Sequence, residues 1–350
     1  RGLKQDMEFD TKILENNNVM IDDQFIGKIN GLKLELDLKK GALETDIKSL
    51  KKAARKTIGP ELEKRIQIVI DTGLVELKND SRIYWNNATI GKLIPGKDYL
   101  SPNIELLVDD MLEQNQKSKL ITFLEKWLKN KISTVLKSLY DLKDLKDKNS
   151  SIKALAYQLY ENNGVIKRDK VTEYLKKLDQ NDRKILRDLG VKFGRYHVFL
   201  FKLIKPEPVS LRTLLWKNHN QKYFNLEPPT FGLNFLNDNK IQNKNFMLLC
   251  GFEKFNNFYI RIDILERLFV QIINSDKKDM KEIKMIPEML NLLGCNKDDF
   301  KQLLKAMSYK ILEKNNEVYF KYIPKKKVKS QNKENIRENP FGVLKDLNLN

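Results

Sequence analysis

The sequence predicts an α+β protein that is mainly helical, with a duplicated hairpin/helix module, a helical middle domain and a C-terminal winged-helix-like domain. Apolar residues recur at three-to-four spacing over much of the chain, which is typical of amphipathic helices. Short β-branched and aromatic runs surround Asp-Asp and Asn-Asn pairs, which is typical of hairpins. The 350 residues, 41% of them hydrophobic, suffice for two or three domains with cores of their own.

The duplicated β-hairpin/helix module is predicted at 1–100. VMIDDQFIGKING at 19–31 and IYWNNATIGKLIPG at 83–96 are similar, with Gly27 and Gly91 as equivalent residues 64 positions apart (91 − 27). The Asp-Asp and Asn-Asn pairs tolerate the left-handed backbone of tight turns, so each run predicts a hairpin.

Helices are predicted between these hairpins at 42–57 and 60–72. Gly59-Pro60 separates them because proline cannot donate to the helical hydrogen-bond ladder, and Gly73 supplies a C-terminal stop.

The helical middle domain is predicted at 101–216. Helical spacing runs from 103 to 148, and DLKDLKDKNSS at 141–151 ends it as a turn or linker. Further helices are expected at 152–160, 168–178 and 181–189.

The segment 217–247 has many Asn residues and Pro228-Pro229, and it predicts a linker or long loop. In the following domain, 248–323, Asp263 and Glu266 resemble a capping box. Helices at 287–293 and 298–307, a turn at 294–296, and strands at 309–312 and 317–322 then follow, which is the order of a winged helix. The remaining 324–350 reads as a basic disordered tail whose lysines could bind phosphates.

Basic and aromatic residues interleave in LGVKFGRYHVFLFKLIKPEPVSLRTLLW, 189–216. Rings can stack on bases while cations neutralise phosphates, so this stretch predicts a nucleic-acid-binding surface. A buried strand with a basic rim is the alternative, in which His197 would be a hydrogen-bonded structural residue. The candidate binding residues here are Lys192, Arg195, Tyr196, His197, Lys202, Lys205 and Arg212.

The predicted winged helix contributes three further candidates. Lys301 and Lys305 lie on the helix expected to enter a groove, and Lys310 lies on the wing. Nearby acidic residues partly offset this positive charge. Because winged helices also serve as protein-docking modules, docking of a protein is the alternative role.

The same region carries a family resemblance, on Leu178-Asp179, Arg183, Leu186-Arg187, 189–194, 197–199, Lys205-Pro206, Leu211-Arg212 and 214–216. These residues resemble the region that follows the motor in alphaproteobacterial superfamily-two ATP-dependent helicases, which are related to the mitochondrial degradosome RNA helicase. The resemblance extends over most of the chain, through successive blocks at 19–36, 82–107, 154–216 and 261–309. Phe201-Lys202 departs from the Pro-Ala of that pattern.

The resemblance implies that this chain is a non-motor, C-terminal accessory region that binds and guides RNA or DNA. The ATP and Mg²⁺ of the family would belong to motor domains in the same parent chain, whose motifs are not present here. Arg1 in place of Met fits a fragment. A stand-alone nucleic-acid-binding or scaffold module remains the alternative.

The charge favours polyanionic partners. Lys and Arg number 65 against 47 Asp and Glu, for a net charge of +18, although an AT-rich genome would account for part of this excess. We expect single-stranded RNA or DNA as the partner and no membrane, since no run of 18 apolar residues occurs. Two cysteines and two histidines without zinc-ligand spacing predict no metal site and a reducing cytoplasm, and the family resemblance implies that this cytoplasm is bacterial.

GKLIPGKD at 91–98 approaches the phosphate-binding loop pattern. Asp98 replaces the hydroxyl that would coordinate Mg²⁺, and Pro95 removes a backbone donor. A repeated turn is therefore expected here, and no cofactor site in this chain.

Overall fold

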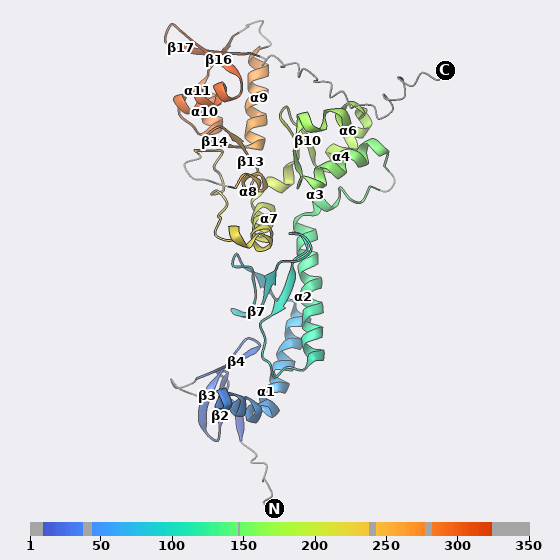
Figure 1. Ribbon diagram of the computed structural model, residues 1–350, viewed down its shortest axis with the longest axis vertical. Helices are drawn as coiled ribbons and strands as arrows, with labels where there is room; N and C mark the ends of the chain where they lie inside the picture. Colours follow the sequence, from blue (N-terminus) through green and yellow to red (C-terminus); the bar gives the residue numbers. More distant parts are fainter. Residues whose placement is uncertain (1–9, 38–43, 146–147, 238–242, 277–281, 324–350) are drawn as a thin grey trace, which may run out of the picture. The chain divides into compact units, whose positions relative to one another are not determined.

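The computed structural model describes residues 10–37, 44–145, 148–237, 243–276 and 282–323 (Figure 1). The α+β class is confirmed, with small antiparallel sheets among the helices. The chain forms two compact units, Arg1–Phe269 and Val270–Asn350. The predicted domain boundaries within them stay predictions.

The first unit begins with two copies of a four-stranded sheet followed by a helix. The first comprises β1 (Thr11–Ile13), β2 (Asn18–Ile21), β3 (Gln24–Asn30), β4 (Lys33–Leu36) and α1 (Glu44–Thr72). The second comprises β5 (Glu76–Leu77), β6 (Arg82–Trp85), β7 (Ala88–Ile94), β8 (Asn103–Leu106) and α2 (Gln114–Val135). Both sheets are meanders in sequence order. The register shifts fall at equivalent points, between Val19 and Met20 and between Ile83 and Tyr84.

The two predicted hairpins are present as β2–β3 and β6–β7. Their turn residues all have positive φ: 47° and 62° at Asp22 and Asp23, 46° and 64° at Asn86 and Asn87. Two consecutive left-handed residues match the twist of the flanking strands, and Asp and Asn tolerate that backbone best after glycine.

The predicted break at Gly59-Pro60 is wrong, because α1 is continuous through Pro60. Ile58, Leu62, Ile66 and Val69 are all buried, and their spacing keeps one apolar stripe on the core. A proline inside a helix costs about 3 kcal/mol. Burying each of these side chains stabilises the fold by roughly 1.5 to 3 kcal/mol, so the stripe outweighs the lost hydrogen bond.

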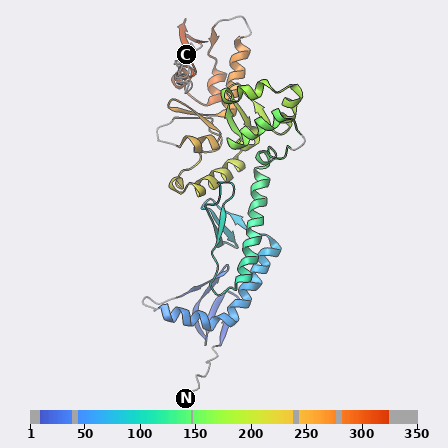
Figure 2. The same cartoon turned by 45° about the vertical axis from the view of Figure 1, so that its right-hand side comes forward.

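The second helix starts later than the sequence predicts. The residues after 103 form strand β8, and α2 begins only at Gln114. Helices α1 and α2 pack against one another, as both views show (Figures 1 and 2). Buried Asp109, just before α2, joins the two copies: its carboxylate accepts the Leu34 backbone N–H at 2.9 Å, and its own N–H donates to Leu32 at 3.0 Å.

The predicted middle helical domain contains a sheet as well. The chain runs through α3 (Lys137–Tyr140), α4 (Ser150–Glu161), β9 (Val165–Lys167), η1 (Arg168–Val171), α5 (Thr172–Lys176), α6 (Gln180–Asp188), β10 (Val191–Phe193) and β11 (His197–Leu200). The strands pair antiparallel in the order β10-β11-β9. Strands of three or four residues are too short to show a period of two, so the sequence predicted a strand only as the alternative for 189–216.

In the rest of the first unit, α7 packs against a further three-stranded sheet. It comprises η2 (Phe201–Ile204), α7 (Pro206–His219), η3 (Gln221–Tyr223), β12 (Phe235–Asn237), α8 (Lys244–Leu249), β13 (Phe252–Phe255), β14 (Phe258–Arg261) and the start of α9 (Ile262–Asp276). Much of 217–237 lacks regular structure, and the segment lies inside the first compact unit. The predicted capping box is wrong: Asp263 accepts from the Arg261 guanidinium at 2.7 Å, and Glu266 points elsewhere.

The second unit repeats the element order of α4 to β11. After α9 come β15 (Ile283–Lys284), α10 (Pro287–Leu293), α11 (Lys297–Ala306), β16 (Tyr309–Lys314) and β17 (Glu317–Tyr322), with strand order β15-β17-β16. The turn between α10 and α11 contains Gly294 at φ 72°. Phe300 and Phe320 fill its core. The predicted helix–turn–helix–hairpin order is present, and the predicted tail at 324–350 lies outside the described residues.

The two equivalent glycines of the repeat differ in their surroundings, which gives a matched test. A Cβ at Gly27 would clash with the carbonyl oxygen of Glu35 on β4, whereas one at Gly91 would meet the Ile104 side chain at 3.3 Å. We expect Gly27→Ala to destabilise the protein by about 1 to 3 kcal/mol, because a backbone oxygen cannot yield without breaking strand pairing. Gly91→Ala should cost less. Urea denaturation of both variants checks this, and equal losses would contradict it.

Candidate nucleic-acid interface

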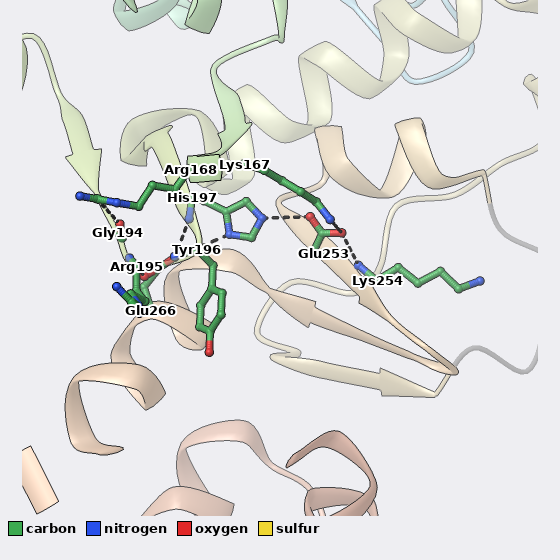
Figure 3. Close-up of polar contacts among 9 residues, drawn as sticks. All are labelled: Lys167, Arg168, Gly194, Arg195, Tyr196, His197, Glu253, Lys254 and Glu266. Atoms are coloured by element: carbon green, nitrogen blue, oxygen red, sulfur yellow. Dashed lines mark hydrogen bonds and ion pairs between the residues drawn. The ribbon is translucent and has the colours of Figure 1, made fainter. Parts of the chain in front are cut away.

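His197 lies at the centre of a buried polar cluster (Figure 3). It is on β11 and only 2% exposed. Its Nε2 lies 2.9 Å from the Glu253 carboxylate on β13, and its Nδ1 lies 3.6 Å from the Glu266 carboxylate on α9. Lys167 on β9 approaches Glu253 at 3.4 Å. His197 is therefore a hydrogen-bonded structural residue, as the buried-strand alternative predicted. Its ring cannot reach a strand bound at the surface.

The tip of the β10–β11 hairpin is held by Glu266. Its carboxylate accepts the backbone N–H groups of Arg195, Tyr196 and His197, the last two at 2.9 Å each (Figure 3). Consecutive backbone N–H groups form an anion-binding concavity, and here a carboxylate from the same chain fills it. The side chains at the tip are held too: the Tyr196 ring packs edge-on at 5.3 Å from Phe269, and the Arg195 guanidinium lies 5.4 Å from the same ring.

The buried charges of this cluster shift each other's pKa. Burial lowers the pKa of His197, but hydrogen bonding and the charges of Glu253 and Glu266 outweigh burial and raise it above 6.5. Burial raises the pKa of Glu253, and His197 with Lys167 outweighs it, so the pKa of that carboxyl is lowered. The cluster therefore favours an imidazolium between two carboxylates.

Arg212, predicted to contact nucleic acid, is wholly buried on α7. Its Nη1 donates to the Asn163 carbonyl at 2.9 Å, and its Nη2 donates to the carbonyls of Leu203 and Leu249 at 2.7 and 2.8 Å. Burial lowers its pKa. These bonds hold the guanidinium in the interior, so we remove Arg212, with His197, from the candidate surface.

The other candidates lie at or near the surface. Lys192, Arg195, Lys202 and Lys205 are exposed, and Tyr196 is half-buried. The Lys205 ammonium lies 4.3 Å from the Phe201 ring centroid. In the second unit Lys305 and Lys310 are exposed. Lys301 forms an ion pair with Glu313 at 2.6 Å, which neutralises much of its charge.

The structure adds α6 to the candidate surface; the sequence analysis predicted this helix but did not name its residues as binding candidates. The guanidinium groups of Arg183 and Arg187 lie 5.6 and 5.7 Å from the Phe193 ring centroid, and Lys184 is exposed on the same helix. A capping box between Asp179 and Asp182 fixes its first turn. The density of positive charge could have indicated this helix from the sequence. Residues 165–200, which include α6, hold ten Lys and Arg against five Asp and Glu, whereas residues 283–322 in the second unit hold seven against five.

The motif at 91–98, which resembles a phosphate-binding loop, begins inside strand β7 and continues into the turn before β8. Gly91 lies inside β7, paired with Leu106, and β8 is the next element along the chain. A phosphate-binding loop instead joins a strand to a helix whose N-terminal N–H groups hold the phosphates. A Cβ at Gly96 would clash with the Ser101 carbonyl, so this glycine serves a tight turn.

Across the described residues, no group of three or more His, Cys, Asp and Glu side chains is arranged to hold a metal ion. Burial raises the pKa of the Cys250 thiol to about 12 and that of Cys295 to about 11, which keeps both thiols protonated. In the part of the chain that the structure describes, every helix is too short or too polar to cross a bilayer.

No protein-family model, curated protein or solved structure matches this chain. Function therefore has to be argued from the residues and their geometry. The helicase resemblance enters that argument as a hypothesis.

The buried cluster predicts a pH-dependent stability. A raised pKa means that the imidazolium of His197 contributes stability that is fully present below its unfolded pKa of about 6.5 and is lost as pH rises through the folded pKa. We expect His197→Asn to destabilise the protein more at about pH 6 than at about pH 9, because the contribution of the imidazolium decreases as pH rises through the raised folded pKa. Urea denaturation at both pH values measures this. A loss independent of pH would show that His197 is neutral in the folded protein.

Because 91–98 lies in a strand and the turn to the next strand, and Asp98 replaces the Mg²⁺-coordinating hydroxyl, we expect that the chain neither binds nor hydrolyses ATP. Calorimetric titration with Mg²⁺-ATP tests this, with Lys97→Ala as the matched variant. Micromolar affinity in the wild type that is lost in the variant would contradict the prediction.

Proposed function

We propose that this chain binds single-stranded RNA or DNA as the non-motor C-terminal accessory region of an ATP-dependent helicase. The observation that carries the proposal is the pair of arginines, Arg183 and Arg187, beside the Phe193 ring. Lys184 and Lys192 lie on the same helix and strand and are exposed. We name α6, with β10, the α6 face.

The α6 face supplies the cations that a single strand requires. Cations neutralise phosphates without regard to sequence, and the half-buried Phe193 ring, which packs against the core, lies beside two of these guanidinium groups. Arg183 also donates to the Leu175 carbonyl at 2.6 Å, so it orients the face, while the exposed Lys184 and Arg187 are the groups that would reach a strand.

Both α4–β11 and α9–β17 follow the helix–strand–helix–helix–hairpin order, and we interpret both as winged-helix-like modules. In such modules the third helix is the usual reading element. Here it is α6 in the first module and α11, with Lys305, in the second. The motor, with its ATP and Mg²⁺, would lie elsewhere in the parent chain, and the protein would act in the bacterial cytoplasm.

The contacts of the second unit favour a different role for that unit, as a protein-docking module. Two lysines among its described residues are paired with acids: Lys301 with Glu313 and Lys314 with Glu282, both at 2.6 Å. Tyr322 and Ile323 are 53% and 49% exposed at the end of its hairpin. This supports the scaffold alternative for the second unit.

Fluorescence anisotropy with labelled single-stranded RNA and DNA, between about 50 and 200 mM salt, tests the proposal. If about four phosphates are neutralised, log K should fall with log salt at a slope near −3, from roughly −0.7 per contact. Combined replacement of Lys184, Arg187 and Lys192 by Ala should reduce that slope by about 2 units.

Lys176→Ala is the matched control, because Lys176 is exposed on neighbouring α5 but paired with Glu173 at 2.7 Å. Its slope should equal that of the wild type. Binding that does not depend on salt, or no binding at low salt, would leave the scaffold role for the whole chain.

A further inference from the structure

We propose that the tip of the β10–β11 hairpin holds the terminal phosphate of a single-stranded nucleic acid, and that Glu266 occupies this site in the free protein. The site is built from the backbone N–H groups of Arg195, Tyr196 and His197 (Figure 3). This inference rests on the proposed function and specifies which part of a strand is bound beyond the α6 face. The hairpin tip follows β10 directly, so the site continues the α6 face along the chain.

The site has four N–H donors, but the Glu266 carboxylate has only two oxygens to accept them. One oxygen accepts the Arg195 N–H, and the other accepts those of Tyr196 and His197 at 2.9 Å each. The fourth donor is the His197 Nδ1, which lies 3.6 Å from the second oxygen and forms no hydrogen bond among the described residues. An imidazolium donates from both ring nitrogens, so a buried donor is left without an acceptor.

A phosphate monoester suits these donors better than the carboxylate does. It presents three acceptor oxygens in a tetrahedral arrangement and carries a charge of about −1.5 to −2 at pH 7. An internal phosphodiester has one negative charge shared by two oxygens, as a carboxylate does, so it has no advantage over Glu266. Only the monoester at the end of a strand therefore offers more charge and more acceptors than the group that it must displace.

The surroundings of the site favour the end of a strand for a second reason. Behind the N–H groups lie His197 and Glu253, which are 2% and 4% exposed, so a bound group cannot pass through. The Glu266 side chain is 12% exposed and marks the open side. The His197 ring meets a ligand only where that carboxylate has left, and a strand bound at the surface does not touch it.

Two guanidinium groups and a glycine complete the site. Arg168 donates to the Gly194 carbonyl at 2.7 Å, and Arg195 is exposed at the tip, so both place positive charge beside the N–H groups. Gly194 leaves the space that the anion fills. A Cβ there would lie 2.3 Å from the Glu266 Cδ and 2.5 and 2.6 Å from its two oxygens. Gly194→Ala would therefore put a methyl group where the anion lies.

The test compares 5′-phosphorylated, 3′-phosphorylated and unphosphorylated forms of one labelled oligouridine on the full chain, by fluorescence anisotropy. The wild type should bind one phosphorylated form several-fold more tightly than the unphosphorylated form. Glu266→Ala removes the competing carboxylate, so this ratio of affinities should rise about 10-fold, the factor that corresponds to one charge-assisted hydrogen bond. If the ratio is one in both proteins, the inference is wrong and the α6 face still stands.

Glu266→Ala combined with Gly194→Ala is the matched variant, because it lacks the clash with Glu266 but has a methyl group among the donors. It should bind phosphorylated and unphosphorylated forms equally, and a retained preference would contradict the site. Asp169→Asn controls for the lost negative charge, since Asp169 is exposed and adjacent to Arg168 in the sequence. It should keep the wild-type ratio. A ratio raised as much as in Glu266→Ala would show that net charge alone causes the preference.

Further outcomes separate the inference from the proposed function. If no oligonucleotide binds the wild type, both fail. If inorganic phosphate or a phosphoserine peptide removes the preference at a lower concentration than the unlabelled phosphorylated oligonucleotide does, the assignment to a strand end is wrong. Thermal melts accompany each variant. Where Glu266→Ala does not fold, Glu266→Gln keeps an acceptor oxygen for the hairpin N–H groups and loses the charge. It should also raise the ratio, and an unchanged ratio in that variant contradicts the proposal.

Discussion

The buried guanidinium of Arg212 is the interaction on which the first unit most depends. Its three hydrogen bonds end at carbonyls of Asn163, Leu203 and Leu249, which lie after α4, in η2 and at the end of α8. A buried charge is costly unless it is hydrogen-bonded, so these three segments must stay in place together. Asn163 is also tied to the second β-sheet copy, because its side chain accepts the Tyr99 hydroxyl at 2.6 Å.

The cluster of His197, Glu253 and Glu266 adds a second connection between the same parts of the first unit. It joins β11 to β13 and to α9, and it fixes the backbone at the hairpin tip. The side chains on β10 and on α6 therefore project from a supported scaffold. Binding groups held by packing and by further hydrogen bonds lose less entropy when they contact a ligand.

The same interior explains why charge alone is a poor guide to the binding surface. Arg212 and Arg187 are both arginines in a basic region. Arg212 is buried and donates to backbone carbonyls, whereas Arg187 is exposed beside Phe193. In the second unit Lys301 is paired with an acid. What distinguishes a candidate contact is a charged group exposed to solvent, as at Lys184 and Arg187.

The sequence by itself determined the features set by neighbours along the chain. Asp22-Asp23 and Asn86-Asn87 predicted the hairpins because their backbone preference is local, and helical spacing predicted most helices and the element order at 287–322. Tertiary structure alone decided the rest. Pro60 stays inside a helix because its apolar stripe meets the core, and the partners of Arg212 and Glu266 lie up to 49 and 71 residues away. Whether a polar side chain is buried or exposed depends on such distant partners, and no local sequence pattern encodes them.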